Sequence, residues 1–159
     1  MAKTNIPMLI AFILLAQLAG VIGSYFTMQN IPIWYDGLAK PSFTPPGWFI
    51  GAVWIALYTL MGVAAYLVAQ KGLDSKQTKL ALSIFGFQLA INMIWSFAFF
   101  GLQSPVLGLV VIVLLWFAIV ETIILFAPIS KTASWLMLPY ILWVSFAAFL
   151  NLEILLMNP

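Results

Sequence analysis

The residue types in this chain that could do chemistry are amides and indoles, and they recur at helical spacing inside apolar segments. Side chains three, four, seven or eight positions apart lie on one face of a helix. Such faces carry Gln88, Asn92 and Trp95 in one segment, Trp54 and Tyr58 in another, and Trp143, Ala147 and Asn151 in a third. Because buried amides and indole N–H groups need partners, these faces predict either an aromatic-walled cavity for a flat, largely apolar ligand or polar contacts between helices. On spacing alone, contacts between helices are the commoner case.

Conventional catalytic and metal-binding residues are missing from the sequence. It contains no histidine, no cysteine, no Gly-rich phosphate loop and no paired carboxylates. We therefore expect no metal site, no required cofactor and no ordinary hydrolytic or phosphoryl-transfer chemistry. The net charge of +2 comes entirely from lysine, so nucleic-acid binding is not expected either.

Glu121 and Glu153 are the acidic residues that fall within apolar segments. A carboxylate inside a membrane is a candidate proton relay or counter-ion. Both, however, lie within about two turns of a segment end, where a side chain can reach the membrane surface. We favour this second interpretation for both; Glu153 is expected on the same side of the membrane as Lys40 and could pair with it.

The elements that must position these residues are membrane-spanning helices. The chain of 159 residues is 65% hydrophobic and 6% charged, with a mean hydropathy of +1.14, whereas soluble domains have roughly 25% charged residues. A helical span needs about 20 apolar residues. Five stretches qualify, which predicts one all-α integral membrane domain over residues 1–159 with helices near 5–28, 46–70, 79–101, 104–127 and 134–157. Pro139 lies inside the fifth stretch and should bend it.

Residues 29–45, here called the lid loop, join the first two expected spans. The stretch from Trp34 to Pro46 is the longest polar, proline-punctuated part of the chain, and its prolines favour a stiff, extended backbone. Its aromatic residues suit a surface that is apolar on one side and wet on the other. We expect a structured lid whose principal residues are Trp34, Asp36, Lys40, Pro41 and Phe43.

The lysines divide unequally between the two ends of this arrangement. The lid loop carries Lys40, and the opposite end carries Lys3, Lys71, Lys76, Lys79 and Lys131. The positive-inside rule therefore predicts a cytoplasmic N-terminus and a lid loop outside the cell.

The third stretch carries small residues at close spacing. Gly86 and Ala90 form a small-xxx-small pattern, and Ser83 precedes them by one turn. Such patterns let helices approach closely, so Ser83, Gly86 and Ala90 are candidates for a dimer interface.

The order of these features resembles the TspO/MBR family, the tryptophan-rich sensory proteins that include the mitochondrial translocator protein (peripheral-type benzodiazepine receptor). The resemblance covers nearly the whole chain. It rests on Trp34-Tyr35-x-x-Leu38-x-Lys40-Pro41-x-Phe43-x-Pro45-Pro46, Trp54-x-x-Leu57-Tyr58, Gln88-x-x-x-Asn92-x-x-Trp95, Pro139-Tyr140-x-x-Trp143 and Asn151-x-Glu153.

The resemblance implies a five-helix membrane bundle, commonly a homodimer, with a pocket beneath the first loop that binds porphyrin, haem or isoquinoline- and benzodiazepine-type drugs. The ligand-binding residues it implies are Tyr35, Pro45, Trp54, Tyr58, Gln88, Asn92, Trp95, Trp143 and Ala147. They largely coincide with the faces identified above, which reverses the preference for simple helix contacts. The first expectation is thus a tetrapyrrole-binding sensor or regulator.

Two alternatives stay open at this point. Some bacterial members are similar in degrading protoporphyrin with light and oxygen, and Trp54 and Trp143 would then be the catalytic positions. A small transporter of porphyrins or amphipathic ligands is the other, although the first three spans lack the carboxylate that proton coupling would use. Residues 150–159 lack the Tyr and Lys/Arg of the cholesterol pattern in animal members, and no basic tail follows the fifth span. Cholesterol transport is therefore not expected, and both features fit a protein of a prokaryotic cell membrane.

Overall fold

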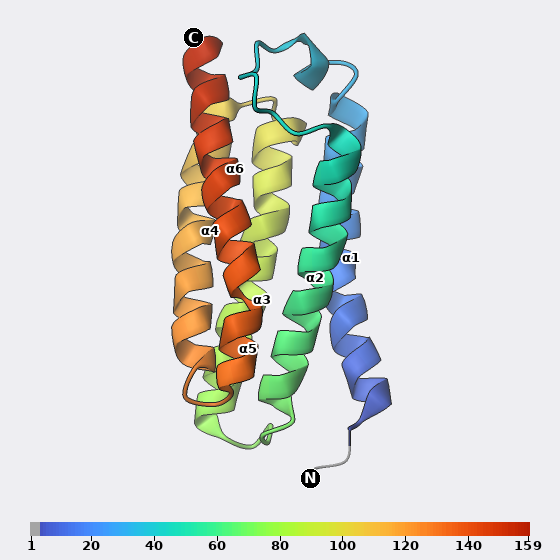
Figure 1. Cartoon of the computed structure of the whole chain (residues 1–159), viewed down its shortest axis with the longest axis vertical. Coiled ribbons are helices and arrows are strands. Elements are labelled where there is room, and N and C mark those ends of the chain that lie inside the picture. The colour runs from blue at the N-terminus through green and yellow to red at the C-terminus, as the bar shows by residue number, and fades with distance from the viewer. Residues whose placement is uncertain (1–3) are drawn as a thin grey trace.

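The computed structural model describes residues 4–159, which form a bundle of long helices running up and down (Figure 1). Five segments are long and apolar enough to cross a membrane. The elements are α1 (Ile6–Asn30), the 3₁₀ turn η1 (Tyr35–Gly37), α2 (Gly47–Ala69), α3 (Lys76–Ser96) with its π-helical continuation η2 (Phe97–Gly101), α4 (Pro105–Phe126), α5 (Lys131–Leu136) and α6 (Leu138–Met157). The expected all-α membrane architecture is confirmed.

Polar caps mark where four of these helices begin. The side chains of Asn5, Ser75, Ser104 and Ser130 each accept a hydrogen bond from a backbone N–H three residues further on. Each cap satisfies one of the N–H groups that a helix start leaves without an intrahelical partner.

Pro139 interrupts the fifth span rather than only bending it. The helix stops at Leu136, and α6 starts at Leu138, with Met137 between them. Pro139 has no N–H to donate to the carbonyl of Trp135, and at the end of α5 the amide of Met137 donates to the carbonyl of Ser134 at 3.2 Å. The short α5 and α6 together form one candidate span, Lys131–Met157.

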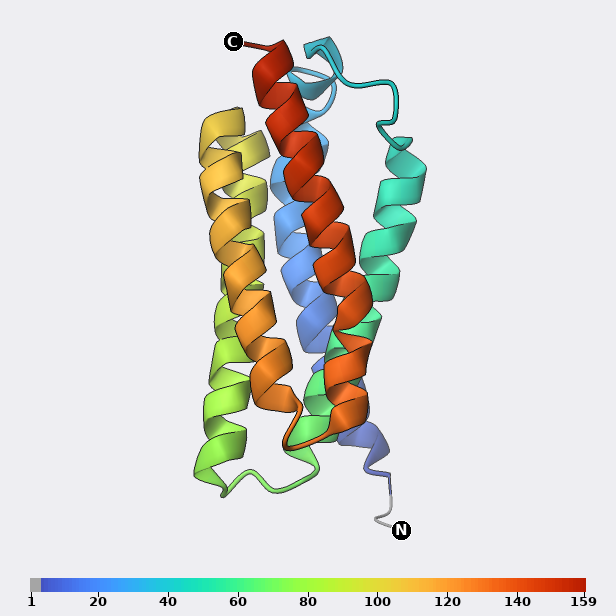
Figure 2. The same ribbon diagram turned by 60° about the vertical axis from the view of Figure 1, so that its left-hand side comes forward.

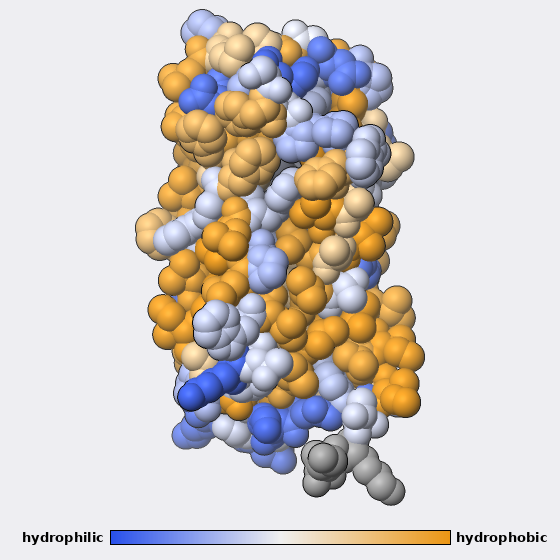
Figure 3. All heavy atoms as spheres, in the orientation of Figure 1, coloured by the Kyte–Doolittle hydropathy of each residue, from blue (hydrophilic) through white to orange (hydrophobic). Residues whose placement is uncertain are grey.

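The two ends of the bundle differ in charge. The turn between α2 and α3 and the start of α5 lie at the lower end in Figure 1 and carry Lys71, Lys76, Lys79 and Lys131. The lid loop and the C-terminal end of α6 lie at the upper end. Lys3, assigned by sequence to the lysine-rich end, lies outside the described residues. In Figure 3 the visible face is mostly apolar between these ends, as a surface facing lipid requires.

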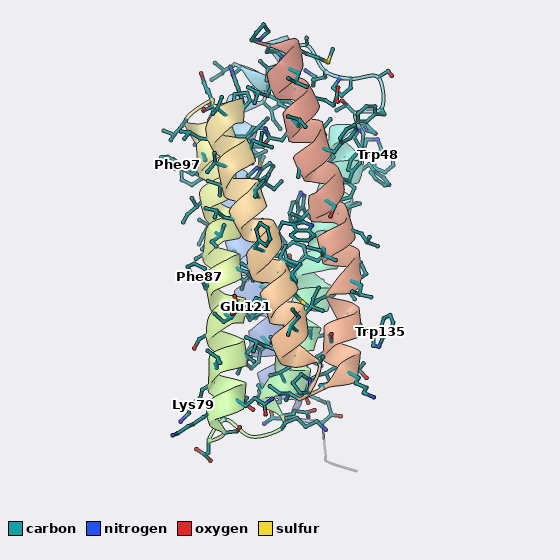
Figure 4. All side chains as sticks on the ribbon, turned by 90° about the vertical axis from the view of Figure 1, so that its left-hand side faces the viewer. Trp48, Lys79, Phe87, Phe97, Glu121 and Trp135 are labelled. Carbon is teal, nitrogen blue, oxygen red and sulfur yellow. The ribbon has the colours of Figure 1, made fainter. Side chains whose placement is uncertain are left out.

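Exposed tryptophans stand near both ends of this apolar band. Trp48, at the start of α2, is 75% exposed, and Trp135 of α5 is 69% exposed. Figure 4 shows both rings pointing outward, Trp48 toward the lid end and Trp135 toward the lysine-rich end. Indole rings prefer the headgroup region of a bilayer, so the two residues fit the two membrane surfaces.

The first helix packs through small residues. The residues that α1 buries are Ala16, Ala19 and Gly23. A Cβ atom added to Gly62 of α2 would lie 2.5 Å from Cα of Ile13, so the two backbones nearly touch there. Close backbone approach of this kind is how small residues hold membrane helices together.

Candidate functional site

A cavity of about 520 Å³ lies beneath the lid loop, between α1, α2, the upper part of α3 and α6. Figure 2 shows that α2 stands apart from α4 and the upper part of α3 at this end, with α6 crossing in front. Most residues that the sequence assigned to a pocket line this cavity: Tyr35, Pro45, Trp54, Tyr58, Asn92, Trp95, Trp143 and Ala147. Its walls are largely apolar, and polar groups gather on its floor.

The floor is held by a chain of buried hydrogen bonds. The hydroxyl of Tyr58 donates to Oδ1 of Asn92 at 2.5 Å, and Nδ2 of Asn92 donates to the hydroxyl of Tyr140 at 2.9 Å. That hydroxyl donates to Oε1 of Gln88 at 2.9 Å, and Nε2 of Gln88 contacts Sδ of Met61 at 3.7 Å. The chain joins α2, α3 and α6, and it satisfies amides that would otherwise destabilise the interior.

Gln88 does not line the cavity, although it shares a helix face with Asn92 and Trp95. It lies one turn of α3 below Asn92, where Met61 and Tyr140 fill the space between the helices. All three side chains are 0% exposed. Gln88 thus supports the floor from behind, and direct contact with a ligand would require these side chains to move.

The indole rings of the walls differ in how their N–H groups are used. Nε1 of Trp95 donates to Oδ1 of Asn151 at 3.5 Å, and Nδ2 of Asn151 donates to the carbonyl of Pro105 at 2.8 Å. Nε1 of Trp143 is buried and has no partner among the described residues. A buried N–H without a partner is unfavourable, so Trp143 retains capacity for one further hydrogen bond.

Stacked rings cover the remaining wall on the α2 side. The ring of Trp54 lies parallel to that of Tyr58, with centroids 5.5 Å apart, and meets the ring of Tyr140 edge-on at 6.2 Å. Such arrangements stabilise aromatic clusters beyond simple burial. They hold Trp54 against the floor, where a flat ligand would lie against its ring.

The α1 wall was not assigned from the sequence. Gln17, Gly20, Ser24 and Thr27 all line the cavity. They fall at i, i+3, i+7 and i+10, a polar and small stripe on an otherwise apolar helix, and this spacing is the signal that could have identified them. Gly20 is the tightest point, since a Cβ atom there would lie 2.4 Å from Cε2 of Tyr58.

The π-helical turn η2 was also not foreseen. In it the amide of Leu102 donates to the carbonyl of Phe97, five residues earlier, at 2.8 Å. The turn directs Phe99 and Phe100 to the cavity, where the ring of Phe99 stacks on Trp95 with centroids 5.6 Å apart. Single π-helical turns often occur at functional sites, but no residue pattern in this chain announces one.

Lys40 organises the lid loop from within. Its ammonium donates to the carbonyls of Tyr35, Leu38 and Asp36 at 2.7, 3.1 and 3.3 Å, and lies 4.7 Å from the centroid of the Tyr35 ring. Within residues 4–159 Lys40 makes no ion pair with Glu153, so the pairing considered from the sequence is wrong. The backbone carbonyls of its own loop provide a nearer set of acceptors, and the carbonyl of Tyr35 accepts from both the Lys40 ammonium and the amide of Leu38.

The sequence predicted an extended backbone for the lid loop, but its first residues are helical. Residues 29 and 30 belong to α1, and η1 follows after four turn residues. Burial, and next the negative charge of Asp36, raise the pKa of the Tyr35 hydroxyl, so that this group stays protonated at neutral pH. Tyr35 accordingly brings a neutral phenol to the cavity.

Ring contacts and side-chain hydrogen bonds fasten the lid loop to the bundle. The ring of Trp34 packs edge-on against Phe99 at 5.4 Å, and the ring of Phe43 stacks on Phe149 of α6 at 5.6 Å. The side-chain amide of Asn158 makes two hydrogen bonds with the backbone of Ala39: Oδ1 accepts from the Ala39 N–H at 3.0 Å, and Nδ2 donates to the Ala39 carbonyl at 2.9 Å. The C-terminal end of α6 thus holds the lid loop as a neighbouring strand would. Of the remaining lid residues, Pro41 closes a turn by accepting from Thr44, and Asp36 is exposed.

The candidate dimer residues face away from the cavity. Ser83 and Gly86 are exposed and Ala90 is half-buried, and a Cβ atom added to Gly86 would meet nothing within 4 Å. Phe87 points outward from the same helix (Figure 4).

Glu121 is exposed on α4. In the part of the chain that the structure describes, no three His, Cys, Asp or Glu side chains come together as a metal site.

Comparison with known proteins places this geometry in a family. The profile of the TspO/MBR family matches residues 12–157. The tryptophan-rich protein TspO of Chlorobaculum tepidum is 46% identical over 88% of this chain and 89% of its own length, and the protein of the same name from Archaeoglobus fulgidus is 44% identical over 97% and 99%. The human translocator protein is 35% identical over 95% of this chain and 89% of its own length. A family profile that covers this much of the chain, together with such relatives, shows that the chain belongs to the TspO/MBR family of integral membrane proteins.

Proposed function

We propose that this protein is a membrane-embedded sensor or regulator that binds a tetrapyrrole, porphyrin or haem, in the cavity beneath the lid loop. The observation that supports this most is the cavity itself, which combines aromatic walls with one polar floor and a fastened cover. Burial of about 300 Å² of apolar ligand surface would contribute roughly 7 kcal/mol before the costs of association. Isoquinoline- and benzodiazepine-type drugs, which are also flat and largely apolar, are expected to occupy the same space.

The haem in this proposal is a ligand and not a bound prosthetic group. The chain has no histidine or cysteine, which are the commonest axial ligands. Ring stacking on Trp54 and Trp95, and a hydrogen bond from Tyr35, would then supply the binding. A metal-free porphyrin is expected to bind comparably, because none of these contacts needs iron.

We further propose a homodimer in a prokaryotic cell membrane, with the N-terminus in the cytoplasm and the lid loop outside. The small-residue stripe of Ser83, Gly86 and Ala90 on α3, in which Ser83 and Gly86 are exposed, supports close contact between two copies. The lysines of the α2–α3 turn and of the start of α5 support the orientation.

Light- and oxygen-dependent degradation of protoporphyrin is a second candidate function. It is favoured by the position of Trp54 and Trp143, which both line the cavity and would lie against a bound porphyrin. A proton-coupled transporter is less well supported, because α1, α2 and α3 carry no acidic residue.

Titration of the detergent-purified protein with protoporphyrin IX, followed by tryptophan fluorescence, tests these proposals. Saturable quenching in the dark is expected, and it should weaken in the Trp54→Phe and Trp143→Phe variants. Trp116→Phe is the matched control, because its indole bonds to Ser145 outside the cavity. Absence of saturable quenching at micromolar porphyrin would contradict the binding function.

Illumination with oxygen then separates the two functions. A porphyrin absorbance that stays constant supports a sensor or regulator. A protein-dependent loss of that absorbance, abolished in Trp54→Phe or Trp143→Phe but kept in Trp116→Phe, would make the protein an enzyme.

A further inference from the structure

In the hydrogen-bond chain below the cavity, each group has a fixed role as donor or acceptor, and Met61 sets the first of these roles. Nε2 of Gln88 lies 3.7 Å from the sulfur of Met61. A thioether has no hydrogen to donate and only accepts, so it faces the NH₂ group of the amide and not its oxygen. Met61 and Gln88 are both 0% exposed, which leaves no bulk water to serve the opposite orientation. The sulfur therefore turns Oε1 of Gln88 toward Tyr140.

Each following bond is fixed by the one before it. An amide oxygen cannot donate, so Tyr140 must use its single hydroxyl hydrogen on Oε1 of Gln88. The oxygen of Tyr140 is then free only to accept, and it takes a hydrogen from Nδ2 of Asn92. Oδ1 of Asn92 consequently faces Tyr58, whose hydroxyl donates to it. The order follows from the chemistry of the groups alone.

Of the members of this hydrogen-bond chain, Tyr58 and Asn92 are the two that line the cavity. Because Tyr58 has already spent its only hydrogen on Asn92, its oxygen can offer nothing but lone pairs. A buried group that can only accept leaves an opposing acceptor unpaired and repelled, whereas it satisfies an opposing donor.

We propose that the Tyr58 hydroxyl on the cavity floor favours ligands that place an N–H or O–H donor against it, such as an amide, a lactam or a protonated carboxylic acid. Ligands whose edge carries only acceptors, such as esters and ketones, bind less tightly. Met61, Gln88 and Tyr140 do not touch the ligand and act as positioning residues that set this preference. The inference rests on the proposed binding function of the cavity and specifies the edge chemistry of its ligand.

Two substitutions of residues that do not touch the ligand change these donor and acceptor roles: one reverses them and the other leaves both arrangements possible. In Gln88→Leu the hydroxyl of Tyr140 has only Oδ1 of Asn92 left as acceptor, so the Asn92 amide turns and presents Nδ2 to Tyr58. Tyr58 then accepts from Asn92 and donates into the cavity. In Met61→Leu neither orientation of Gln88 is fully satisfied, so both are populated.

A matched pair of neutral ligands measures the preference: the diamide and the dimethyl ester of protoporphyrin IX. They share the ring system, and only the diamide has donors at the propionate positions. In the unaltered protein we expect the diamide to bind about fivefold more tightly, the effect of one ordinary hydrogen bond. The ratio should fall toward one in Met61→Leu and reverse in Gln88→Leu. It should also be lost in Tyr58→Phe. Met137 is also fully buried but lies outside the hydrogen-bond chain, so Met137→Leu should keep the ratio of the unaltered protein.

The ratio of two affinities separates this role from a loss of folding, which would weaken both ligands alike. A ligand-free readout comes from the tyrosine doublet in ultraviolet resonance Raman spectra, which distinguishes a phenol that donates from one that accepts. Subtraction of the Tyr58→Phe spectrum isolates Tyr58, which should be a donor in the unaltered protein and an acceptor in Gln88→Leu.

Equal binding of diamide and ester by the unaltered protein would overturn the inference while leaving the proposed function intact. An unchanged ratio in both Met61→Leu and Gln88→Leu would also overturn it. If neither derivative nor protoporphyrin IX itself quenched the tryptophans, the proposed function would fail, and the selection inferred from it would fail as well.

Discussion

Replacement of Gly20 by alanine should disturb the cavity from the side of α1. The added Cβ atom would lie 2.4 Å from Cε2 and 2.7 Å from Cδ2 of Tyr58. Contact distances between carbon atoms are about 3.5–4.0 Å, so the ring or α1 must move by about 1 Å. The ring has little freedom, because it stacks on Trp54 and its hydroxyl is bonded to Asn92.

The change in the free energy of unfolding has two destabilising contributions and one stabilising contribution. Overpacking in a filled interior costs about 1–3 kcal/mol, and loss of the hydrogen bond to Asn92 costs about 1 kcal/mol more. Alanine in place of glycine in a helix returns roughly 0.5–1 kcal/mol. We therefore expect Gly20→Ala to lower the free energy of unfolding by about 1–3 kcal/mol and to weaken porphyrin binding.

Gly51→Ala is the matched control. Gly51 also lines the cavity, from the facing helix α2, but a Cβ atom there would meet nothing within 4 Å. Unfolding in detergent, followed by circular dichroism during titration with sodium dodecyl sulfate, should show a loss only for Gly20→Ala. A Gly20→Ala variant as stable as Gly51→Ala would refute the reasoning. In a Tyr58→Phe background the loss should be smaller by the contribution of the missing hydrogen bond.

Three further changes test other parts of the structure. Asn158→Ala removes both bonds to Ala39, and hydrogen exchange of the Ala39 amide should become at least tenfold faster, a result that unchanged exchange would contradict. Gly86→Leu places a bulky side chain on the small-residue stripe of α3 and should reduce cross-linked dimers without a change in monomer stability; equal cross-linking would exclude this face. Gly62→Ala brings a Cβ atom against the backbone of Ile13, which cannot move aside as a side chain can, so its thermal unfolding temperature should fall further than that of Gly20→Ala.

Most of the fold could be predicted from the sequence because apolar length decides it. A stretch of about 20 apolar residues has few alternatives to a spanning helix. The helical spacing of Asn92 and Trp95, and of Trp143 and Ala147, also identified residues that the structure brings together around one cavity. The family resemblance decided between a cavity and simple helix contacts, which the spacing could not.

The rest depended on distances between elements. Gln88 has the same spacing as its cavity-lining neighbours, and only the position of Met61 and Tyr140 against it shows that it lies behind the floor. Lys40 was matched with Glu153 by charge, but carbonyls of its own loop lie closer. Phe99 and Phe100 of the π-helical turn pack against Trp34 and Tyr35 of the lid loop, and no local propensity reports such packing.

The shallow burial of α1 has a consequence for how the protein is assembled during synthesis. Helix α1 leaves the ribosome first, yet the partners of Gly20, Gly23 and Ile13 belong to α2 and α3, which are made later. Its hydropathy is high enough to keep it in the bilayer by itself, so insertion and packing are separate stages. The small residues of α1 therefore act at the docking stage, when α2 and α3 pack against them. The cavity is completed when an already inserted helix meets the later ones, and the lid loop is the tether that keeps this last encounter intramolecular.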